Sequence, residues 1–264
     1  MKPCHFAVYS KMFENNSVMI EKLKKELGQN GFVYDEIRPS LIIVLGGDGS
    51  FMRAIHDPKL PRGKDISYLL FNTGHLGFYS DYAKGEEDAF IHALINQEPE
   101  VEYLPFFRFV IDKKKEHHFI NDIAIQTGET VFMDVYVNDE MLTESRCNGI
   151  VIGTPTGSSG YLLSLNSPVV INAPDVYQFS LISPCHNRLF PNTITKAIIG
   201  GDQELKVIIH EGNFDIYVDG GHKTKLKGHE FTFSHKKDEL VSLLHLKSIT
   251  VVSRIRKNIS GKED

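Results

Sequence analysis

Five residues, Gly46-Gly47-Asp48-Gly49-Ser50, place one carboxylate among three glycines directly after the apolar run Leu41–Leu45. Glycines at the carboxyl end of a buried strand let backbone N–H groups approach a ligand closely, and a following helix favours phosphate at its N-terminus. A carboxylate laid against phosphate would repel it, so Asp48 should act on a proton or a metal. In a phosphoryl transfer it would accept the proton of the attacking hydroxyl while the glycine amides hold the phosphates. The plain alternative is a strand–helix turn in which Asp48 caps the helix.

A second glycine-containing turn, Asn-Thr-Gly-His-Leu-Gly-Phe at residues 72–78, follows the apolar run Ile66–Phe71. Ligands of open α/β sheets bind outside the carboxyl ends of the strands. Two glycine turns that each follow a buried strand therefore indicate one binding cleft.

A third segment, Thr-Pro-Thr-Gly-Ser-Ser-Gly-Tyr at residues 154–161, follows a strand-like run at 149–152. Its hydroxyls and backbone could bond a polar ring, with Tyr161 packing nearby. A turn followed by an N-capped helix is the other interpretation.

Two residue pairs, each containing one aspartate, complete the set of candidates. Asn121-Asp122 lies in a strand between isoleucines, where an amide and a carboxylate could grip a sugar diol or the reacting hydroxyl. Its alternative is an ordinary edge-strand or turn pair. Asp219-Gly220 follows another apolar run, and its alternative is a hairpin turn.

The pattern of elements changes along the chain. Strand and helix patterns alternate over the first hundred residues, which predicts a parallel sheet covered by helices. After Pro99, short strands follow one another, as in an antiparallel sandwich. We expect a Rossmann-like open α/β domain over residues 1–99, joined by the tail at about 248–264, and a β-sandwich domain over 100–247. The strands expected in the second domain are Val101–Asp112, His118–Gln126, Thr130–Asn138, Leu205–His210, Phe214–Asp219 and Glu230–Ser234.

The composition of the 264-residue chain is that of a globular protein, with 41% hydrophobic and 24% charged residues. A net charge of −5 provides no global field for nucleic acid or an anionic membrane, so phosphates must be held locally. Cys4, Cys147 and Cys185 form no CxxC pair, which fits a reducing cytosol. No signal-peptide pattern or membrane-length apolar run is present, so we expect a soluble cytoplasmic protein without nucleic-acid or membrane partners.

Taken together and in this order, these segments resemble the NAD kinase family in its short bacterial form. Residues 46–50 match the family's GGDGT-type motif, 72–78 its aromatic glycine loop, 121–122 its Asn-Glu pair, 154–161 its TPTGSTAY segment and 218–220 its late VDG. The resemblance covers about residues 40 to 220. GGDG alone also occurs in lipid kinases and phosphofructokinases, whereas GGDG in tandem with TPTGS is specific.

The resemblance implies phosphorylation of the 2′-hydroxyl of the adenosine ribose of NAD, with Asp48 as the general base. It implies ATP as the donor, together with Mg²⁺ or another divalent metal that no side chain binds directly. The sequence itself leaves another nucleotide or polyphosphate open as the donor. It also implies a homo-oligomer, usually a tetramer. The implied NAD-binding residues are Asp48, Gly49, Phe78, Tyr79, Asn121, Asp122, Arg146, Asn148, Ser158, Ser159, Gly160, Tyr161, Ser164 and Asp219. The implied phosphate-binding residues are Gly46, Gly47, Gly49 and Ser50.

Three positions depart from the family pattern. Asn148-Gly149 stands where Asp-Gly is usual, so a contact that needs a carboxylate is lost. Ser159-Gly160 replaces Thr-Ala and opens space near the ring, and Asp122 replaces Glu and is one methylene shorter. None of these positions touches GGDG, so we expect activity to survive.

Two other functions remain open on the sequence. The first is a kinase of the same superfamily that acts on a lipid or a sugar, against which the segment at 154–161 speaks. The second is a dinucleotide-binding regulator without catalysis, suggested by Asn148 and Gly160. A dehydrogenase is disfavoured because the sequence has no GxGxxG motif.

Overall fold

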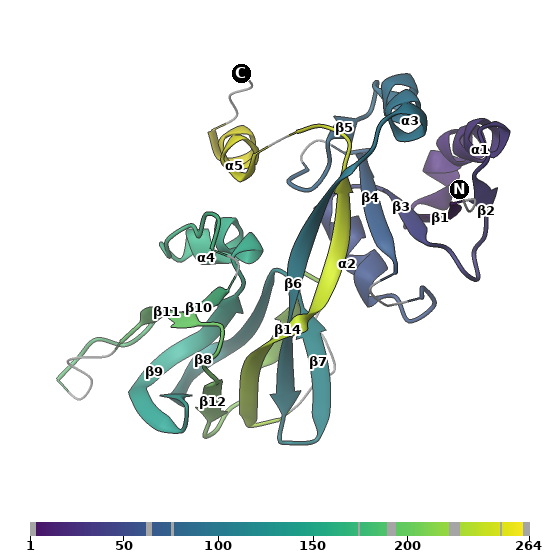
Figure 1. Cartoon of the computed structure of the whole chain (residues 1–264). Helices are drawn as coiled ribbons and strands as arrows, with labels where there is room; N and C mark the ends of the chain where they lie inside the picture. Colours follow the sequence, from purple (N-terminus) through teal and green to yellow (C-terminus); the bar gives the residue numbers. More distant parts are fainter. Residues whose placement is uncertain are drawn as a thin grey trace. The chain divides into compact units, whose positions relative to one another are not determined.

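The computed structural model describes residues 4–61, 65–74, 77–173, 175–188, 194–221, 228–248 and 250–260 (Figure 1). The chain divides into two compact units. Unit 1 comprises Met1–Leu104 and Leu240–Asp264, and unit 2 comprises Pro105–Glu239. Unit 1 is an open α/β structure and unit 2 is built of antiparallel strands, so the expected fold class is confirmed. Among the described helices, none combines the length and the apolar character that crossing a membrane requires.

The sheet of unit 1 is parallel, with the order β2-β1-β3-β4. Every residue of β3 is buried, as expected for a parallel strand with both faces covered. Both β5 and the last part of β14 also pair with β4 in parallel. The strands are β1 (His5–Ser10), β2 (Val33–Tyr34), β3 (Leu41–Leu45), β4 (Ser67–Asn72), β5 (Tyr82–Ala83) and the end of β14 (Glu230–His245).

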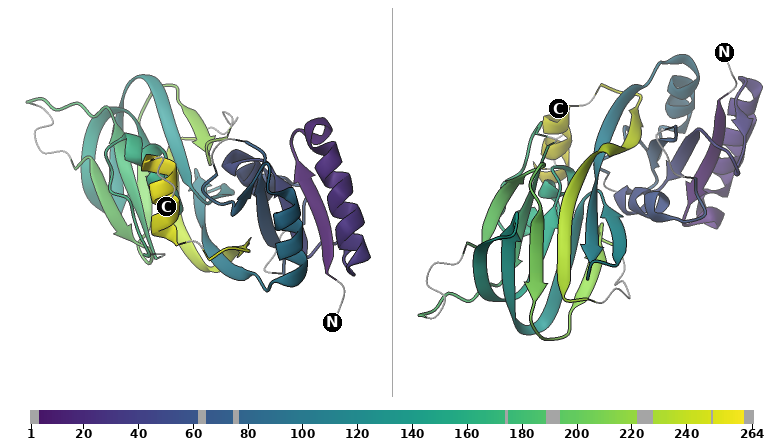
Figure 2. Two further views of the ribbon diagram at one scale, coloured as in Figure 1. Left: turned by 90° about the horizontal axis from the view of Figure 1, so that it is seen from above. Right: turned by 60° about the horizontal axis from the view of Figure 1, so that its bottom comes forward.

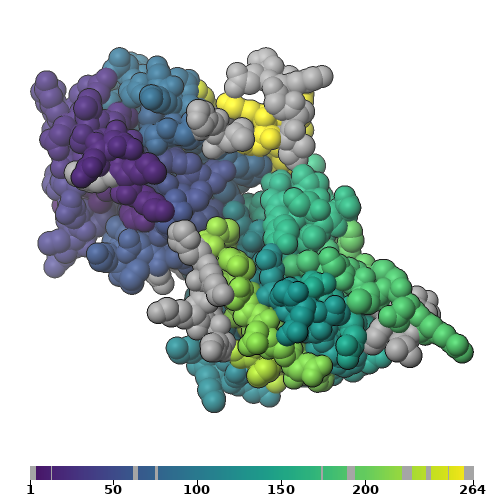
Figure 3. Space-filling view, turned by 180° about the vertical axis from the view of Figure 1, so that it is seen from behind, coloured from purple at the N-terminus to yellow at the C-terminus, as the bar shows by residue number. Residues whose placement is uncertain are grey.

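The helices α1, α2 and α3 of unit 1 each bury an apolar face, whereas the buried residue among the described side chains of α5 is Arg254. In α1 the buried Ile20, Leu23 and Leu27 recur at spacings of three and four, whereas Val18 on the opposite face is 82% exposed. Figure 2 shows α1 lying alongside β1, and the purple atoms in Figure 3 belong to this N-terminal part of the chain. The helices are α1 (Phe13–Gln29), α2 (Asp48–His56), α3 (Glu87–Asn96) and α5 (Val251–Ser260).

The main sheet of unit 2 has the order β11-β10-β9-β8-β12-β14, and its described pairs are antiparallel. The hairpin between β8 and β9 turns at Asn138-Asp139, whose φ angles of 49° and 65° are those of a two-residue hairpin turn. The elements are β6 (Glu100–Ile111), β7 (Lys115–Phe119), β8 (Asp122–Val137), β9 (Glu140–Gly153), η1 (Thr156–Ser159), α4 (Tyr161–Ser164), β10 (Val176–Ile182), β11 (Lys196–Gly200), β12 (Leu205–Ile209) and β13 (Asp215–Val218).

Aromatic side chains fill much of the core of unit 2. The ring of Phe107 lies 5.3 Å from that of Tyr177, 5.8 Å from that of Phe119 and 4.4 Å from that of His235. Phe109 stacks on Phe233 at 5.9 Å. Because large aromatic rings bury much apolar area, this cluster contributes strongly to holding the strands together.

The observed limits of the two units differ from the boundary predicted at residues 99–100, where the sequence changes from alternating strands and helices to successive strands. Residues of β6 and of β14 belong to both units, so the change after Pro99 marks the start of β6, and unit 2 begins at Pro105. At the other end β14 runs on to His245, past the last residue of unit 2 at Glu239.

Several strands also differ from the expected ranges. The strand expected at His118–Gln126 is interrupted, because β7 ends at Phe119 and β8 begins at Asp122. From there β8 continues as one strand to Val137, with a register shift against β9. The strands β10 and β11 were not expected, and the tail forms the helix α5.

Replacing Phe107 by alanine should remove the centre of the aromatic core of unit 2. A fully buried phenylalanine truncated to alanine costs about 3–5 kcal/mol, because transfer energy and cavity energy add. Tyr103 on the same strand is 59% exposed, so Tyr103→Ala should change stability by only about 0.5 kcal/mol. Equilibrium urea denaturation of the two variants measures the difference, and equal losses would contradict the assignment of the core.

Candidate active site

The turn after β3 requires its first glycine. Gly46 has a φ of 151°, and a Cβ placed on it would lie 2.2 Å from the Oγ of Ser50. The Gly46 N–H donates to the carbonyl of Phe71 at the end of β4, at 3.0 Å. Gly47 caps α2, which begins at Asp48, and Gly49 is exposed in the first turn. The N-terminus of α2, where Gly49 is exposed, is therefore the phosphate-favouring end of a helix that follows the carboxyl end of β3.

The carboxylate of Asp48 organises the backbone that follows β4. Its Oδ2 accepts the N–H of Phe78 at 2.9 Å, and its Oδ1 accepts the N–H groups of Phe78 at 3.0 Å and Tyr79 at 3.2 Å. The glycine turns after β3 and β4 thus meet, and that they form one binding cleft stays a prediction. In the segment 72–78, His75 and Leu76 lie outside the described residues. Asp48 makes no side-chain bond that caps its own helix.

Burial raises the pKa of Asp48 above its ordinary value, and the hydrogen bonds from Phe78 and Tyr79 offset part of that rise. Tyr79 itself is 2% exposed and packs edge-on against Phe51 of α2 at 5.2 Å. Asp48 therefore bonds a loop that the buried Tyr79 anchors, and its raised pKa makes it a stronger base than an exposed aspartate.

In unit 2 the carboxylate of Asp219 has a similar role. It accepts the N–H groups of Ile120 at 3.0 Å, Asn121 at 2.6 Å and Asp122 at 3.2 Å. These bonds explain why the strand expected at His118–Gln126 is interrupted. Asp219 is 5% exposed and has a φ of 50°. Its carboxylate thus holds the Asn121-Asp122 backbone in place.

The segment at 154–161 packs directly on the Asn121 backbone. The Thr154 N–H donates to the Asn121 carbonyl at 2.9 Å, and the hydroxyls of Thr154 and Thr156 both donate to the carbonyl of Ile120. A Cβ on Gly157 would lie 2.0 Å from the Asn121 carbonyl oxygen. The structure therefore brings these two predicted segments together.

Hydroxyls of this segment divide into inward and outward groups. Ser158 is buried, donating to the carbonyl of Pro155 at 2.6 Å and accepting the N–H of Val170 at 2.9 Å. Ser158 thus holds the turn, whereas Gly160 and Ser164 are exposed and Ser159 is half-buried. The Tyr161 hydroxyl accepts a bond from the side chain of Gln126 at 2.9 Å.

The environment of Asp122 favours its neutral form. Burial raises the pKa of Asp122 to about 7, and the charge of Asp219 adds to the rise. A Cβ on Gly160 would lie 3.7 Å from Asp122 Oδ2 and 3.3 Å from the Gly157 carbonyl. The glycine at 160 thus leaves space beside this carboxyl that an alanine would fill.

Arg146 and Asn148 lie on β9 beside the buried Cys147. Because side chains alternate along a strand, both face away from the core that Cys147 joins. Arg146 is exposed and Asn148 is half-buried. A Cβ on Gly149, at φ 137°, would lie 2.1 Å from the carbonyl oxygen of Ile125, so this position requires glycine.

One group of side chains in the described residues could hold a metal ion: Glu116, His118 and Glu239 of unit 2. The Nε2 of His118 lies 3.0 Å from a Glu239 oxygen and 3.4 Å from a Glu116 oxygen. Arg108 also donates to Glu116 at 3.1 Å, so the group is held as an ion-pair network. The sequence predicts that no side chain directly ligates the divalent metal of the reaction, and this stays a prediction.

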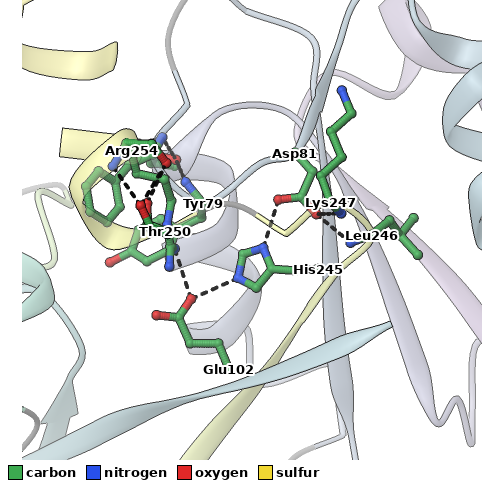
Figure 4. Close-up of polar contacts among 11 residues, drawn as sticks. Tyr79, Asp81, Glu102, His245, Leu246, Lys247, Thr250 and Arg254 are labelled. Carbon is green, nitrogen blue, oxygen red and sulfur yellow. Dashed lines mark hydrogen bonds and ion pairs between the residues drawn. The ribbon is translucent and has the colours of Figure 1, made fainter. Parts of the chain in front are cut away.

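Unit 1 contains a buried cluster of charged side chains that none of the sequence motifs indicates. His245 Nδ1 lies 2.8 Å from Asp81 and its Nε2 lies 2.8 Å from Glu102, which also accepts a bond from Arg254 at 2.9 Å (Figure 4). Asp81 accepts the N–H groups of Leu246 and Lys247 as well. These residues come from separate parts of the chain, so only the folded structure reveals their proximity.

Comparisons with known proteins agree with this architecture. A family model described as ATP-NAD kinase C-terminal domain matches residues 120–241. A crystal structure of yeast NADH kinase complexed with NADH superposes with a TM-score of 0.78 at 18% identity, covering 100% of this chain and 89% of that one. An NAD kinase from Archaeoglobus fulgidus in complex with ATP gives a TM-score of 0.72 at 20% identity, covering 97% of each chain. This chain therefore shares its fold with an NADH kinase and an NAD kinase.

Two sequence relatives identify the family of the chain. The NAD kinase of Lactococcus lactis subsp. cremoris is 32% identical over 204 residues, which are 74% of each chain. The NAD kinase of Enterococcus faecalis is 30% identical over 207 residues, which are 76% of this chain and 77% of the relative. The chain belongs to the NAD kinase family.

Gly157→Ala should loosen the contact between the 154–161 segment and Asn121. Its Cβ would overlap the Asn121 carbonyl, so the backbone must shift at a cost of about 1–3 kcal/mol. Gly128→Ala is the matched control, because a Cβ there meets nothing within 4 Å. Thermal unfolding of both variants compares the two changes, and an equal effect would contradict the described packing.

The raised pKa of Asp122 predicts a pH-dependent stability. Because the folded state binds this proton more tightly than the unfolded state, its contribution to stability falls as pH rises from about 4 to about 7 and then stays constant. Asp122→Asn should therefore gain melting temperature relative to the parent protein between pH 5 and pH 8. Asp202→Asn, at an exposed position in the same unit, is the control. A gain independent of pH would contradict the assignment.

Proposed function

We propose that this protein is an NAD kinase, which transfers the γ-phosphoryl group of ATP to the 2′-hydroxyl of the adenosine ribose of NAD and forms NADP. Membership of the NAD kinase family supports the reaction. The observation that carries the mechanism is the Asp48 carboxylate, held by two backbone amides at the N-terminus of α2 and shifted toward a stronger base.

Phosphate groups of the donor are assigned to the turn after β3. Gly46, Gly47 and Gly49 leave the backbone unshielded by side chains, and the first turn of α2 offers N–H groups with the positive end of the helix. Ser50 lies in the same turn, buried against the Gly46 backbone. This arrangement holds negative charge locally in a chain whose net charge is −5.

Asp48 would orient and deprotonate the attacking hydroxyl. An ionised carboxylate has about four lone-pair sites on its two oxygens. The N–H groups of Phe78 and Tyr79 make three hydrogen-bond contacts with these oxygens. The remaining capacity can accept a ribose O–H while the amides prevent the carboxylate from rotating. Preorganisation of this kind lowers the cost of reaching the reactive geometry.

The proposed metal is Mg²⁺ or another divalent cation that arrives with ATP. Asp48 is engaged by backbone donors, so phosphate oxygens and water would supply the ligands of the cation. When bound, the cation neutralises the charge of the phosphates. Every proton step in the proposal belongs to Asp48.

The rings and sugars of the dinucleotide are assigned to residues of unit 2 and to the loop after β4. Asn121 and Asp122, fixed by Asp219, would bond ribose hydroxyls, and a neutral Asp122 could donate as well as accept. The remaining residues assigned to the dinucleotide are Phe78, Tyr79, Arg146, Asn148, Ser159, Gly160, Tyr161 and Ser164. Ser158 would act indirectly by holding the turn.

The proposal also covers the cellular location, the oligomeric state and the phosphoryl donor of the enzyme. The cysteines Cys4, Cys147 and Cys185 are all free, in keeping with the proposed cytoplasmic location. A homotetrameric state is part of the proposal and rests on the family resemblance. Polyphosphate stays an alternative to ATP as the donor. No observation favours a lipid or sugar acceptor over NAD.

The reaction is tested by incubating purified protein with Mg²⁺, ATP and NAD and measuring NADP. In Asp48→Asn the amide oxygen can still accept the N–H bonds of Phe78 and Tyr79, so the loop should stay in place. Loss of a general base should lower kcat by about 10²- to 10⁴-fold, with nearly normal NAD binding by calorimetry.

Asp88→Asn is the matched control, because that carboxylate is 90% exposed on α3 and should leave kcat unchanged. Parental turnover in Asp48→Asn would remove Asp48 as the base. Tight NAD binding without product in the parent protein would instead support a regulator, and phosphorylation of a lipid diol in place of NAD would support a lipid kinase.

A further inference from the structure

The loop from Phe78 to Asp81 is attached at both of its ends. At its start the amides of Phe78 and Tyr79 hold Asp48, and the Phe78 ring lies 5.4 Å beneath the guanidinium of Arg254. At its end the Asp81 carboxylate is 3% exposed and contacts His245. The same four residues therefore connect Asp48 to the C-terminal part of the chain.

The imidazole of His245 lies between two carboxylates. Its Nδ1 is 2.8 Å from Asp81 Oδ1 and its Nε2 is 2.8 Å from Glu102 Oε2 (Figure 4). A neutral imidazole donates from only one nitrogen, so it could bond only one of these acceptors. A protonated ring donates from both nitrogens and satisfies both carboxylates. The geometry is therefore that of an imidazolium bridge.

The bridge is joined to the second anchor of the loop. Glu102 Oε2 accepts from both His245 and Arg254, and Arg254 is the residue whose guanidinium covers Phe78. Side chains of His245 and Arg254 are each 8% exposed. Since a buried charge that loses its partner is costly, the removal of one member should disturb the others.

We propose that His245 is a positioning residue for phosphoryl transfer, whose protonated ring bridges Asp81 and Glu102 and so fixes the loop that holds Asp48. The inference rests on the proposed function for its kinetic consequence. His245 has no role in the chemistry itself and acts through the Phe78 and Tyr79 amides.

The pH range of the bridge follows from the groups that face His245. These are Asp81 before β5, Glu102 on β6 and Arg254 on α5. Burial alone would lower the pKa of His245, but the bonds to Asp81 and Glu102 raise it to about 9. Burial would raise the pKa of Glu102, but His245 and Arg254 lower it to about 2. The bridge is thus complete near neutral pH and is lost as pH rises through about 9.

The first test measures the loop without using activity. Hydrogen–deuterium exchange of peptides covering Phe78 and Tyr79 is compared between the parent protein, His245→Asn and the exposed control His92→Asn. We expect exchange in His245→Asn to be roughly tenfold faster in this loop, with the core strand β3 unchanged. Equal exchange in the parent and in folded His245→Asn would overturn the positioning role.

The second test uses the pH profile of NADP formation. In the parent protein kcat should fall above about pH 9, and His245→Asn should lower kcat by about 10- to 100-fold at neutral pH with little change in the KM for NAD. Glu102→Gln keeps the shape but removes a charge that favours the imidazolium, so its alkaline limb should move to lower pH. A purely structural role would lower stability without moving this limb.

Glu102→Gln also keeps the inference testable where His245→Asn does not fold. An alkaline limb at the same pH in Glu102→Gln and in the parent protein would overturn the proposal. A parent protein that forms no NADP at any pH would end the proposed kinase function, whereas the exchange measurement would still decide whether His245 fixes the loop.

Discussion

A half-buried carboxylate that accepts backbone N–H groups from a neighbouring turn is the interaction on which the candidate site depends. Asp48 begins α2, and its bonds to Phe78 and Tyr79 join the ends of β3 and β4, which are adjacent strands of the parallel sheet. Unpaired, these amides would cost free energy in a partly buried loop. The same contact that satisfies the backbone therefore also fixes the orientation of the proposed base.

In unit 2 the carboxylate of Asp219 likewise accepts backbone N–H groups of an irregular stretch. This carboxylate accepts the amide N–H groups of residues 120–122. The carbonyls of the same stretch accept the hydroxyls of Thr154 and Thr156 and the N–H of Thr154. Donors and acceptors of one irregular stretch are thus satisfied by two separate segments. Burial near Asp219 then makes Asp122 easier to protonate, so the arrangement that shapes the backbone also sets the chemistry of the side chain.

Much of this organisation could be predicted from the sequence because it depends on local patterns. The run Leu41–Leu45 followed by glycines defines a buried strand and a turn, and a second such turn after β4 implied their meeting. The interruption between β7 and β8 could not be predicted, because it depends on Asp219, about a hundred residues away in the chain. The inward orientation of Ser158 likewise depends on the amide of Val170. His245 belongs to no motif, and its importance arises from carboxylates that only the folded chain places beside it.

Unit 1 is assembled from both ends of the chain, whereas unit 2 is one continuous stretch from Pro105 to Glu239. During synthesis from the N-terminus, every residue of unit 2 leaves the ribosome before Leu240 does. Unit 2 can therefore complete its sheet while unit 1 still lacks the end of β14 and the helix α5. The segment that carries His245 and Arg254 emerges after the whole of unit 2, so the loop beside Asp48 acquires its anchors only after that unit has emerged. A nascent chain can accordingly form the sandwich before it holds an ordered phosphoryl-transfer centre.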